Sequence, residues 1–412
     1  MRGARGPRAP GGDPPRTGGR PEGTNSSDGR HQVGRQPSEA EIARRFRVMR
    51  AAVGEAGLDA LIVCGSEYTG FGGGVRYMSG FRIVHRYSYV VVPLEGDPLA
   101  VFPSEARYVG DHADGFVHDQ VFADCPGEWM ASHLSAAGAR RVGVYGLDYI
   151  MCVRDYRALQ SSALEIVGFD DEFDLARAVR SQEELDMVRE TMAINESGFW
   201  AVQSAFRRPG VTQAELMAEA EAVFSRAGCG RQTMDMVLWG THGSATPEFR
   251  IPEHETPVAP DDLLLYSLEV AGPSGYWVEF TRPLCQGAVS ESTSLLLEAY
   301  AEYYERVPKA LSAGQSAHDA HRTCSEPFRS RGLQLGHVTG HSIGMTMIEH
   351  PRIGDGVEVE LLSDMVISMH PHVLSADGRS CMYMQDTWRI AQGEAELLSL
   401  VPMKVFDGTE RP

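Results

Sequence analysis

Long apolar runs, paired cysteines and excess basic charge are all missing from this sequence. No stretch of roughly 18 consecutive apolar residues occurs, which argues against a membrane-spanning helix. The first residues lack the apolar segment of a secretory signal. The chain has 38 Lys and Arg against 56 Asp and Glu, and its formal net charge of −18 disfavours nucleic acid and anionic membranes as partners. We therefore expect a soluble protein.

The seven cysteines are odd in number, widely spaced and without a C-x-x-C pair. This pattern favours neither a disulfide framework nor a zinc knuckle. Because reduced thiols are typical of the cytosol, we predict a cytoplasmic protein.

Length and composition indicate two globular domains behind a tail. The 412 residues exceed what one domain usually needs, and 42% of them are hydrophobic. Residues 1–37 are rich in Gly, Pro and Arg, so they cannot bury enough surface to offset the entropy of ordering. We predict a disordered tail over 1–37, a first domain over 38–178 and a second over 179–408.

The first domain has the pattern of an α/β fold. Ser38 and Glu41 form a capping box in front of an amphipathic helix that ends near Gly57. Residues 60–64 read as a buried strand, and residues 89–93 and 99–102 flank a turn and predict a hairpin. Further strands are expected at residues 142–145 and 164–167.

The second domain has the pattern of an α+β fold. Capping boxes at Ser181–Glu184 and Thr212–Glu215 each start a predicted helix. A third helix is expected at residues 290–311. The predicted strands cover residues 233–239, 263–270, 276–284, 365–369 and 382–390.

Four short motifs in this domain carry a family resemblance. They are the helix start from Arg180 to Leu185, Thr281-Arg282 two residues after Glu279, Gly340-His341-Ser342-Ile343-Gly344, and a strand at 365–369 followed by His370-Pro371. In this order they resemble the superfamily of creatinase, aminopeptidase P, prolidase and methionine aminopeptidase. The resemblance implies a creatinase-type N-terminal α/β domain, an α+β pita-bread catalytic domain and a homodimer.

The same resemblance implies an altered metal site. The family holds two metal ions with two Asp, one His and two Glu, because carboxylates bridge hard divalent cations. The corresponding residues here are Glu279 for the second Asp, His341 for the His, His370 for the first Glu and Gln385 for the second Glu. The first Asp falls on Leu268 by an ungapped count, or on Glu269 after a shift of one residue.

Two states of this site stay open. Glu279, His341, His370 and Gln385 surround one of the family's two metal positions, and two His with a carboxylate suit zinc, iron or manganese. The other position, which needs Leu268 and Gln385, lacks ligands. Alternatively the site works without metal, as creatinase does, and Glu279 pairs with His341 or Arg282 in the core.

Both histidines that transfer protons in the family are replaced. Glu248 stands at the first position and Ile348 at the second, while His242 and His350 lie nearby. We predict Glu248, His337, His341 and Glu279 as catalytic residues. Arg282, His350 and Glu349 are the predicted substrate-binding residues, since the planar fork of an arginine suits a carboxylate.

Five of the fourteen histidines lie between residues 337 and 372, a density that favours an enzyme over a scaffold. The first hypothesis is an enzyme, a hydrolase or lyase, that acts on a small non-peptide molecule. It cleaves or rearranges a C–N or related bond by acid–base chemistry, without metal or with one divalent metal. The alternatives are an Xaa-Pro metallopeptidase with unusual ligands and a non-catalytic scaffold of the same fold.

Overall fold

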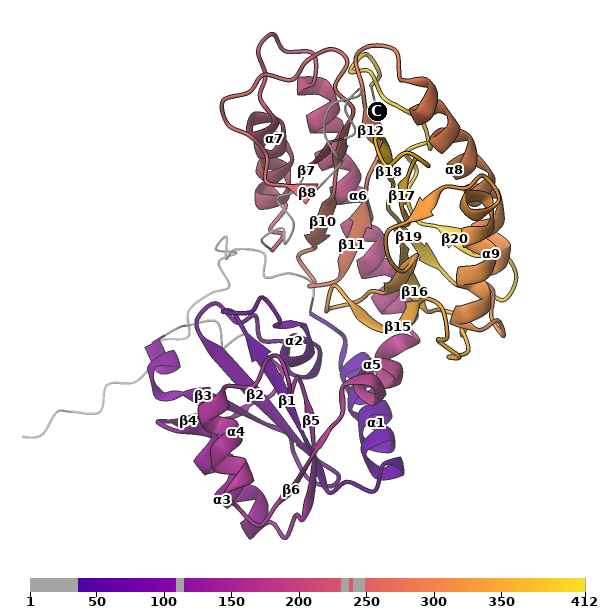
Figure 1. Ribbon diagram of the computed structural model, residues 1–412. Coiled ribbons are helices and arrows are strands. Elements are labelled where there is room, and N and C mark those ends of the chain that lie inside the picture. Colours follow the sequence, from indigo (N-terminus) through magenta and orange to yellow (C-terminus); the bar gives the residue numbers. More distant parts are fainter. Residues whose placement is uncertain (1–35, 109–114, 231–236, 240–248, 412) are drawn as a thin grey trace, which may run out of the picture. The chain divides into compact units, whose positions relative to one another are not determined.

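The computed structural model describes residues 36–108, 115–230, 237–239 and 249–411. The predicted tail therefore lies almost wholly outside the described residues. The first described elements form an α/β domain around one mixed sheet of six strands, in the order β4-β3-β2-β1-β5-β6 (Figure 1). Its strands are β1 (Ala60–Ser66), β2 (Tyr87–Pro93), β3 (Leu99–Pro103), β4 (Asp119–Ala123), β5 (Arg141–Tyr145) and β6 (Glu165–Gly168).

The apolar runs of the sequence form the centre of this sheet. Every residue of β1 is buried, as expected for a continuous apolar strand with both faces covered. Strands β2 and β3 pair antiparallel, which confirms the predicted hairpin. The helices are α1 (Glu39–Glu55), α2 (Gly73–Ser79), the short 3-10 helix η1 (Ser104–Tyr108), α3 (Pro126–Ala136), α4 (Val153–Gln160) and α5 (Asp170–Ala178).

The second domain starts with two helices that begin at the predicted caps. In both capping boxes, Ser181–Glu184 and Thr212–Glu215, each side chain bonds the backbone N–H of the other residue. These boxes start α6 (Gln182–Ala205) and α7 (Gln213–Arg226). The later helices α8 (Glu291–Ala310) and α9 (Ala317–Arg329) pack side by side along the C-terminal strands (Figure 1).

The strands of the second domain form four hydrogen-bonded groups, in the orders β10-β11, β12-β9-β7-β8, β13-β17-β18 and β15-β14-β16-β19-β20. The first strands are β7 (Val237–Trp239), β8 (Phe249–Arg250), β9 (Leu264–Tyr266), β10 (Leu268–Ala271), β11 (Trp277–Phe280) and β12 (Pro283–Leu284). The later strands are β13 (Gln334–Leu335), β14 (Gly340–Ser342), β15 (Glu349–Ile353), β16 (Val366–Met369), β17 (His372–Leu374), β18 (Cys381–Tyr383), β19 (Asp386–Arg389) and β20 (Glu396–Leu397). The predicted α+β pattern is confirmed.

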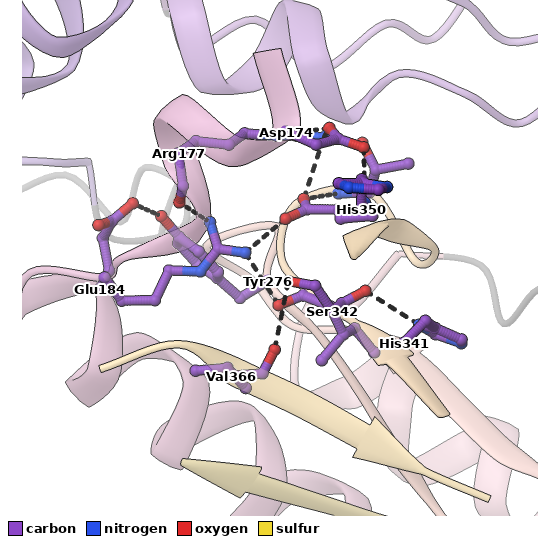
Figure 2. Close-up of polar contacts among 12 residues, drawn as sticks. Asp174, Arg177, Glu184, Tyr276, His341, Ser342, His350 and Val366 are labelled. Atoms are coloured by element: carbon purple, nitrogen blue, oxygen red, sulfur yellow. Dashed lines mark hydrogen bonds and ion pairs between the residues drawn. The ribbon is translucent and has the colours of Figure 1, made fainter. Parts of the chain in front are cut away.

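Buried ion pairs join α5 to the start of β15. Glu349 Oε1 lies 3.1 Å from Arg177 Nη2, and Glu349 Oε2 accepts a hydrogen bond from Arg180. Arg177 also donates to Asp174 Oδ1 at 2.7 Å, and Asp174 Oδ2 accepts from the backbone N–H of His350 at 2.9 Å (Figure 2). The side chains of Glu349, Arg177 and Arg180 have no solvent exposure. This network ties the first domain to the strand next to β14.

All seven cysteines are free thiols. Among the described residues, none of the helices combines the length and apolarity that a bilayer crossing needs.

Candidate functional site

The hairpin of β10 and β11 places two glutamates side by side. Glu269 and Glu279 are direct cross-strand partners, and directly opposed residues of an antiparallel pair project from the same face. Glu269 lines the site cavity, whereas Leu268 points the other way and packs in the apolar core. The residue at the first Asp position is therefore Glu269. The ungapped count that chose Leu268 is wrong because neighbouring strand residues face opposite sides.

His341 comes from β14, between β15 and β16. Its Nδ1 lies 2.9 Å from the backbone oxygen of Ser342 (Figure 2), and its Nε2 lies 3.4 Å from Glu279 Oε1. The glycine before it is required by close packing, since a Cβ on Gly340 would lie 2.3 Å from the backbone oxygen of Ser368. The second glycine of the motif, Gly344, is equally constrained, because a Cβ there would meet Arg180 at 2.3 Å.

His370 follows β16 and is the one imidazole of the site whose two ring nitrogens, Nδ1 and Nε2, are both buried without a hydrogen-bond partner among the described residues. A buried polar group without a partner is costly, so it points to a ligand that is bound in the working protein. Burial lowers the pKa of His370 to about 3. The ring is thus neutral at pH 7, which is the form that coordinates a metal.

Three donors come together at this point. One ligand atom each from Glu279, His341 and His370 lies within 4.8 Å of the other two, and all three residues are buried. Two histidines and one carboxylate are the protein ligands of catalytic zinc in several peptidases, and they also suit iron. The three side chains therefore fit one divalent cation, which is one of the two states that the sequence leaves open.

Gln385 lies beside this triad but does not offer it a ligand. Its Oε1 accepts hydrogen bonds from Ser267 Oγ at 2.7 Å and Thr281 Oγ1 at 2.6 Å. Its Nε2 faces the two glutamates, at 2.8 Å from Glu269 Oε1 and 3.2 Å from Glu279 Oε2. The prediction of Gln385 as a fourth metal ligand disagrees with this arrangement, because its only coordinating atom already accepts two hydrogen bonds.

The carboxylates of the hairpin have opposite proton affinities. Burial raises the pKa of Glu269 to about 8, and the charge of Glu279 acts in the same direction. Burial also acts to raise the pKa of Glu279, but the neighbouring His341 outweighs it and brings this pKa well below the ordinary value. Burial acts to lower the pKa of His341, yet Glu279 outweighs that effect and raises it. Glu269 is consequently protonated at neutral pH and Glu279 is ionised.

The Thr281-Arg282 motif positions the residues behind the site. Arg282 binds Asp386 with two hydrogen bonds, from Nη1 at 2.9 Å and Nη2 at 3.1 Å, and it also donates to the backbone oxygens of Val401 and Pro402. Its side chain has no exposure and does not line the cavity. The prediction that Arg282 binds the substrate is therefore wrong. Its carboxylate partner in the core is Asp386, whereas the sequence had suggested Glu279.

A cavity of about 350 Å³ opens onto the triad. Its lining comprises the five residues already placed around the metal position or predicted as catalytic, namely Glu269, Glu279, His337, His341 and His370, together with Val338, Met347, Ile348, Arg352 and Tyr383. His337 is at its rim, where its ring centroid lies 5.4 Å from that of His370. The position is compatible with the predicted role of His337 in proton transfer.

Glu349 and His350 line a second cavity of about 530 Å³. Ile348 and Arg352 line both cavities, so the two are neighbours. Glu349 is held by Arg177 and Arg180, which leaves its carboxylate no free oxygen for a substrate. The prediction of Glu349 as a substrate-binding residue is wrong for this reason. His350 does not reach the first cavity, and its Nδ1 lies 3.6 Å from Asp171 Oδ1.

Arg352 is an arginine that sequence reasoning did not select. It is the register partner of His341 across β14 and β15 and it is exposed, and its side chain has no ion pair or hydrogen bond with any residue that the structure describes. Alternation along β15 is the signal that would have found it, because His350 and Arg352 share a face. The same reasoning on β18 identifies Tyr383, two residues before Gln385. Glu248, the other predicted proton carrier, lies outside the described residues, as does the nearby His242.

Solved structures with the same fold span nearly the whole described chain. Dipeptidase PepE from Mycobacterium ulcerans has a TM-score of 0.74 at 23% identity, covering 89% of this chain and 98% of its own. The Xaa-Pro dipeptidase from Bacillus anthracis has a TM-score of 0.72 at 19% identity, covering 89% and 99%. The architecture is therefore the predicted α/β domain followed by a pita-bread domain.

Relatives at the sequence level are named as peptidases. YqhT of Bacillus subtilis, an uncharacterized peptidase, is 23% identical over 345 residues, which cover 80% of this chain and 90% of that protein. The model of metallopeptidase family M24 matches residues 186–392. That segment is half of the 412 residues and contains all three residues of the triad. The chain belongs to metallopeptidase family M24.

Proposed function

We propose that this protein hydrolyses short peptides with a single divalent metal ion held by Glu279, His341 and His370. The observation that carries the proposal is His370, a neutral buried imidazole with two unpartnered ring nitrogens next to Glu279 and His341. A cation held there would supply Lewis-acid chemistry by polarising a peptide carbonyl. Zinc, iron and manganese are the candidates, and the donor set favours zinc or iron over manganese.

The cavity supports a small substrate with a free carboxylate. Its volume of about 350 Å³ lies at the lower end of the range for small-molecule sites, which suits a dipeptide. Arg352 lines it and its side chain has no partner among the described residues, so its guanidinium is available to bind the substrate's C-terminal carboxylate in a bidentate manner. This assigns to Arg352 the role that the sequence suggested for Arg282.

Glu269 supplies a second polar contact. Its Oε1 accepts a hydrogen bond from Gln385 Nε2 and lies 2.6 Å from Ser267 Oγ, whereas its buried Oε2 has no partner among the described residues. Because Glu269 lines the cavity and is protonated at neutral pH, it can donate a hydrogen bond to a substrate oxygen. The chain's own residues thus offer the substrate two polar contacts in the cavity.

A peptide substrate has more support than the non-peptide molecule first suggested. The family and the relatives are named for peptidases, and none of the names points to a non-peptide substrate. The non-peptide hypothesis rests only on the altered ligands, and these ligands are also those of a one-metal peptidase.

The test is elemental analysis of protein purified without added metal, followed by hydrolysis assays. We expect one metal ion per chain and cleavage of dipeptides, tested with and without C-terminal proline. Glu279→Gln and His370→Ala should each lower metal affinity and activity by at least about 100-fold. Replacing a residue that only supports a metal ligand already costs up to about 100-fold, and these two residues would bind the metal themselves. His318→Ala is the matched control, because His318 pairs with Asp355 away from the cavity.

Two results would contradict the proposal. One is a metal-loaded, folded protein that cleaves no dipeptide. The other is full activity in His370→Ala or in protein stripped of metal, which would return the site to metal-free acid–base chemistry.

A further inference from the structure

We infer that the carboxamide of Gln385 occupies, within the folded chain, the place where the two-metal members of the family hold their second cation. The chain then binds one metal ion at most, and a two-metal site is latent behind a single side chain. This inference takes the first metal from the proposed function, but its contacts and its test do not depend on peptide hydrolysis.

The amide nitrogen of Gln385 acts as a neutral replacement for a cation. Nε2 lies 2.8 Å from Glu269 Oε1, 3.2 Å from Glu279 Oε2 and 3.0 Å from the hydroxyl oxygen of Tyr383. These two glutamates stand at the positions of the family's two aspartates. An N–H donor thus points at the carboxyl groups that a second metal ion would have to join.

The amide oxygen fixes this orientation. Oε1 lies between the hydroxyl groups of Ser267 and Thr281, which donate to it at 2.7 Å and 2.6 Å. A flipped amide would place its oxygen against Glu269 and Glu279, where only a proton of Glu269 or the hydroxyl group of Tyr383 could favour it, and would turn its N–H groups toward the two hydroxyl groups. The two hydroxyl donors on one side and the two glutamates on the other therefore select a single orientation.

The surroundings offer a second cation few free ligand atoms, because Glu269 Oε2 is the one oxygen of the two glutamates without a partner among the described residues. Gln385 is fully buried, and Glu269 and Glu279 are each 2% exposed. A metal ion at this place would have to displace the amide and break its hydrogen bonds, leaving buried polar atoms without partners. It would also need bridging carboxylates, whereas the bridging position offers a neutral amide that already accepts two hydrogen bonds. The residues do not fit a second metal ion.

A single substitution should make this place suitable for a second metal ion. Gln385→Glu exchanges the amide for a carboxylate of the same shape, so that Glu269, Glu279 and the new side chain face one another. Three buried carboxyl groups at this separation repel unless they are protonated or bind a cation. The hydroxyl groups of Ser267 and Thr281 remain in place to support one oxygen of the new carboxylate.

The experiment counts metal ions per chain. Full-length protein is stripped of metal, titrated with Zn²⁺ or Mn²⁺ and measured by elemental analysis and native mass spectrometry. We expect one ion per chain in the wild type and two in Gln385→Glu. Gln385→Met is the matched control, because it keeps the length of the side chain but removes the amide without adding charge, and it should stay at one.

Thermal unfolding gives a second readout that covers poor folding of the variant. Metal-stripped Gln385→Glu should melt below the wild type, and its Tm should keep rising until two equivalents are bound, whereas the wild type should saturate at one. Two ions in the wild type would overturn the inference whether or not the variant folds. A folded Gln385→Glu that binds no more metal than the wild type would overturn it as well.

The outcomes separate this inference from the proposed function. No metal in the wild type but one ion in Gln385→Glu would remove the one-metal peptidase and keep the role of Gln385. One ion in the wild type without any dipeptide cleavage would do the same. Two ions in the wild type together with dipeptide cleavage would keep a peptidase and remove the inference.

Discussion

At the scale of single residues, four arginines fall into two groups, according to whether a carboxylate of the protein contacts the guanidinium group. Arg177, Arg180 and Arg282 are buried and each contacts a carboxylate of the protein. Such arginines are structural, because their donors are used inside the fold. Arg352 is exposed, lines both cavities and has no partner among the described residues, so its donors are available to a ligand.

For Arg352 we predict a change in substrate affinity. Arg352→Gln should raise KM for a dipeptide about 10–100-fold with little change in kcat, since hydrogen bonds to charged groups contribute about 1.5–3 kcal/mol. Arg352→Lys should recover only part of the affinity, because an ammonium group cannot bind a carboxylate in bidentate fashion. Steady-state kinetics checks this, with the C-terminally amidated dipeptide as the control substrate. An equal loss on the amidated substrate would contradict the assignment.

Glu269 gives a prediction about pH. Its folded-state pKa of about 8 lies above its ordinary value of 4.5, so the folded protein binds this proton more tightly than the unfolded chain. The ionised carboxylate therefore opposes folding above pH 8, and this effect fades as the pH falls toward 4.5. In metal-stripped protein, Glu269→Gln should be more stable than the wild type at pH 9. The difference should shrink by about 2–3 kcal/mol on going to pH 6, at 1.36 kcal/mol per pH unit.

Urea unfolding of both proteins at several pH values measures this difference directly. Titrating groups that do not interact with Glu269 are common to the two proteins and cancel in the comparison, which leaves Glu269 and its neighbours Glu279 and His341. A stability difference that stays flat between pH 6 and pH 9 would show that Glu269 titrates normally.

At the scale of elements, the sequence predicts best where local chemistry decides the structure. The capping boxes before α6 and α7 and the hairpin of β2 and β3 depend on residues a few positions apart, and all three form as expected. The helices α2, α3, α4, α5 and α9 were not predicted. In α9 the buried face is built largely from Ala317, Ala320 and Cys324, and Pro327 lies inside the helix, so the apolar pattern is weak.

The candidate site shows the same division. The motif containing His341 and the strand before His370 predict the metal triad, because family spacing fixes which positions face the cavity. Spacing does not reveal which side of the strand Leu268 and Glu269 face. A shift of one residue exchanges the side chain in the core for the side chain in the cavity. Nor does spacing reveal the partners of Arg282 and Glu349, because Asp386 and Arg177 are distant in sequence and reach them only in the folded chain.

At the scale of the whole molecule, a chain with a net charge of −18 relies on a few buried positive charges to join its parts. Arg177 comes from α5 at the end of the first domain, Arg180 stands at the start of the second, and both contact Glu349 at the start of β15. Burial acts to raise the pKa of Glu349, but Arg177 and Arg180 outweigh it and hold the pKa below its ordinary value. The ionised carboxylate is therefore the form that joins the two domains at neutral pH.

Glu349→Gln is predicted to weaken the contact between the two domains more than it perturbs the candidate site. It leaves Arg177 and Arg180 buried with one carboxylate fewer, and removing one partner of a buried ion pair costs about 3–5 kcal/mol. Asp171→Asn is the matched control, since Asp171 is exposed and its contact with His350 belongs to the class of pairs worth about 0–1 kcal/mol.

Calorimetry at neutral pH measures the effect. Glu349→Gln should show a lower Tm and a transition that broadens or splits, because the two domains begin to unfold separately. Asp171→Asn should unfold like the wild type. Metal binding by the triad should persist in Glu349→Gln below its first transition, because Glu349 contributes to neither the metal ligands nor the first cavity. A single sharp transition at the wild-type temperature would mean that the apolar contacts between the domains suffice without this network.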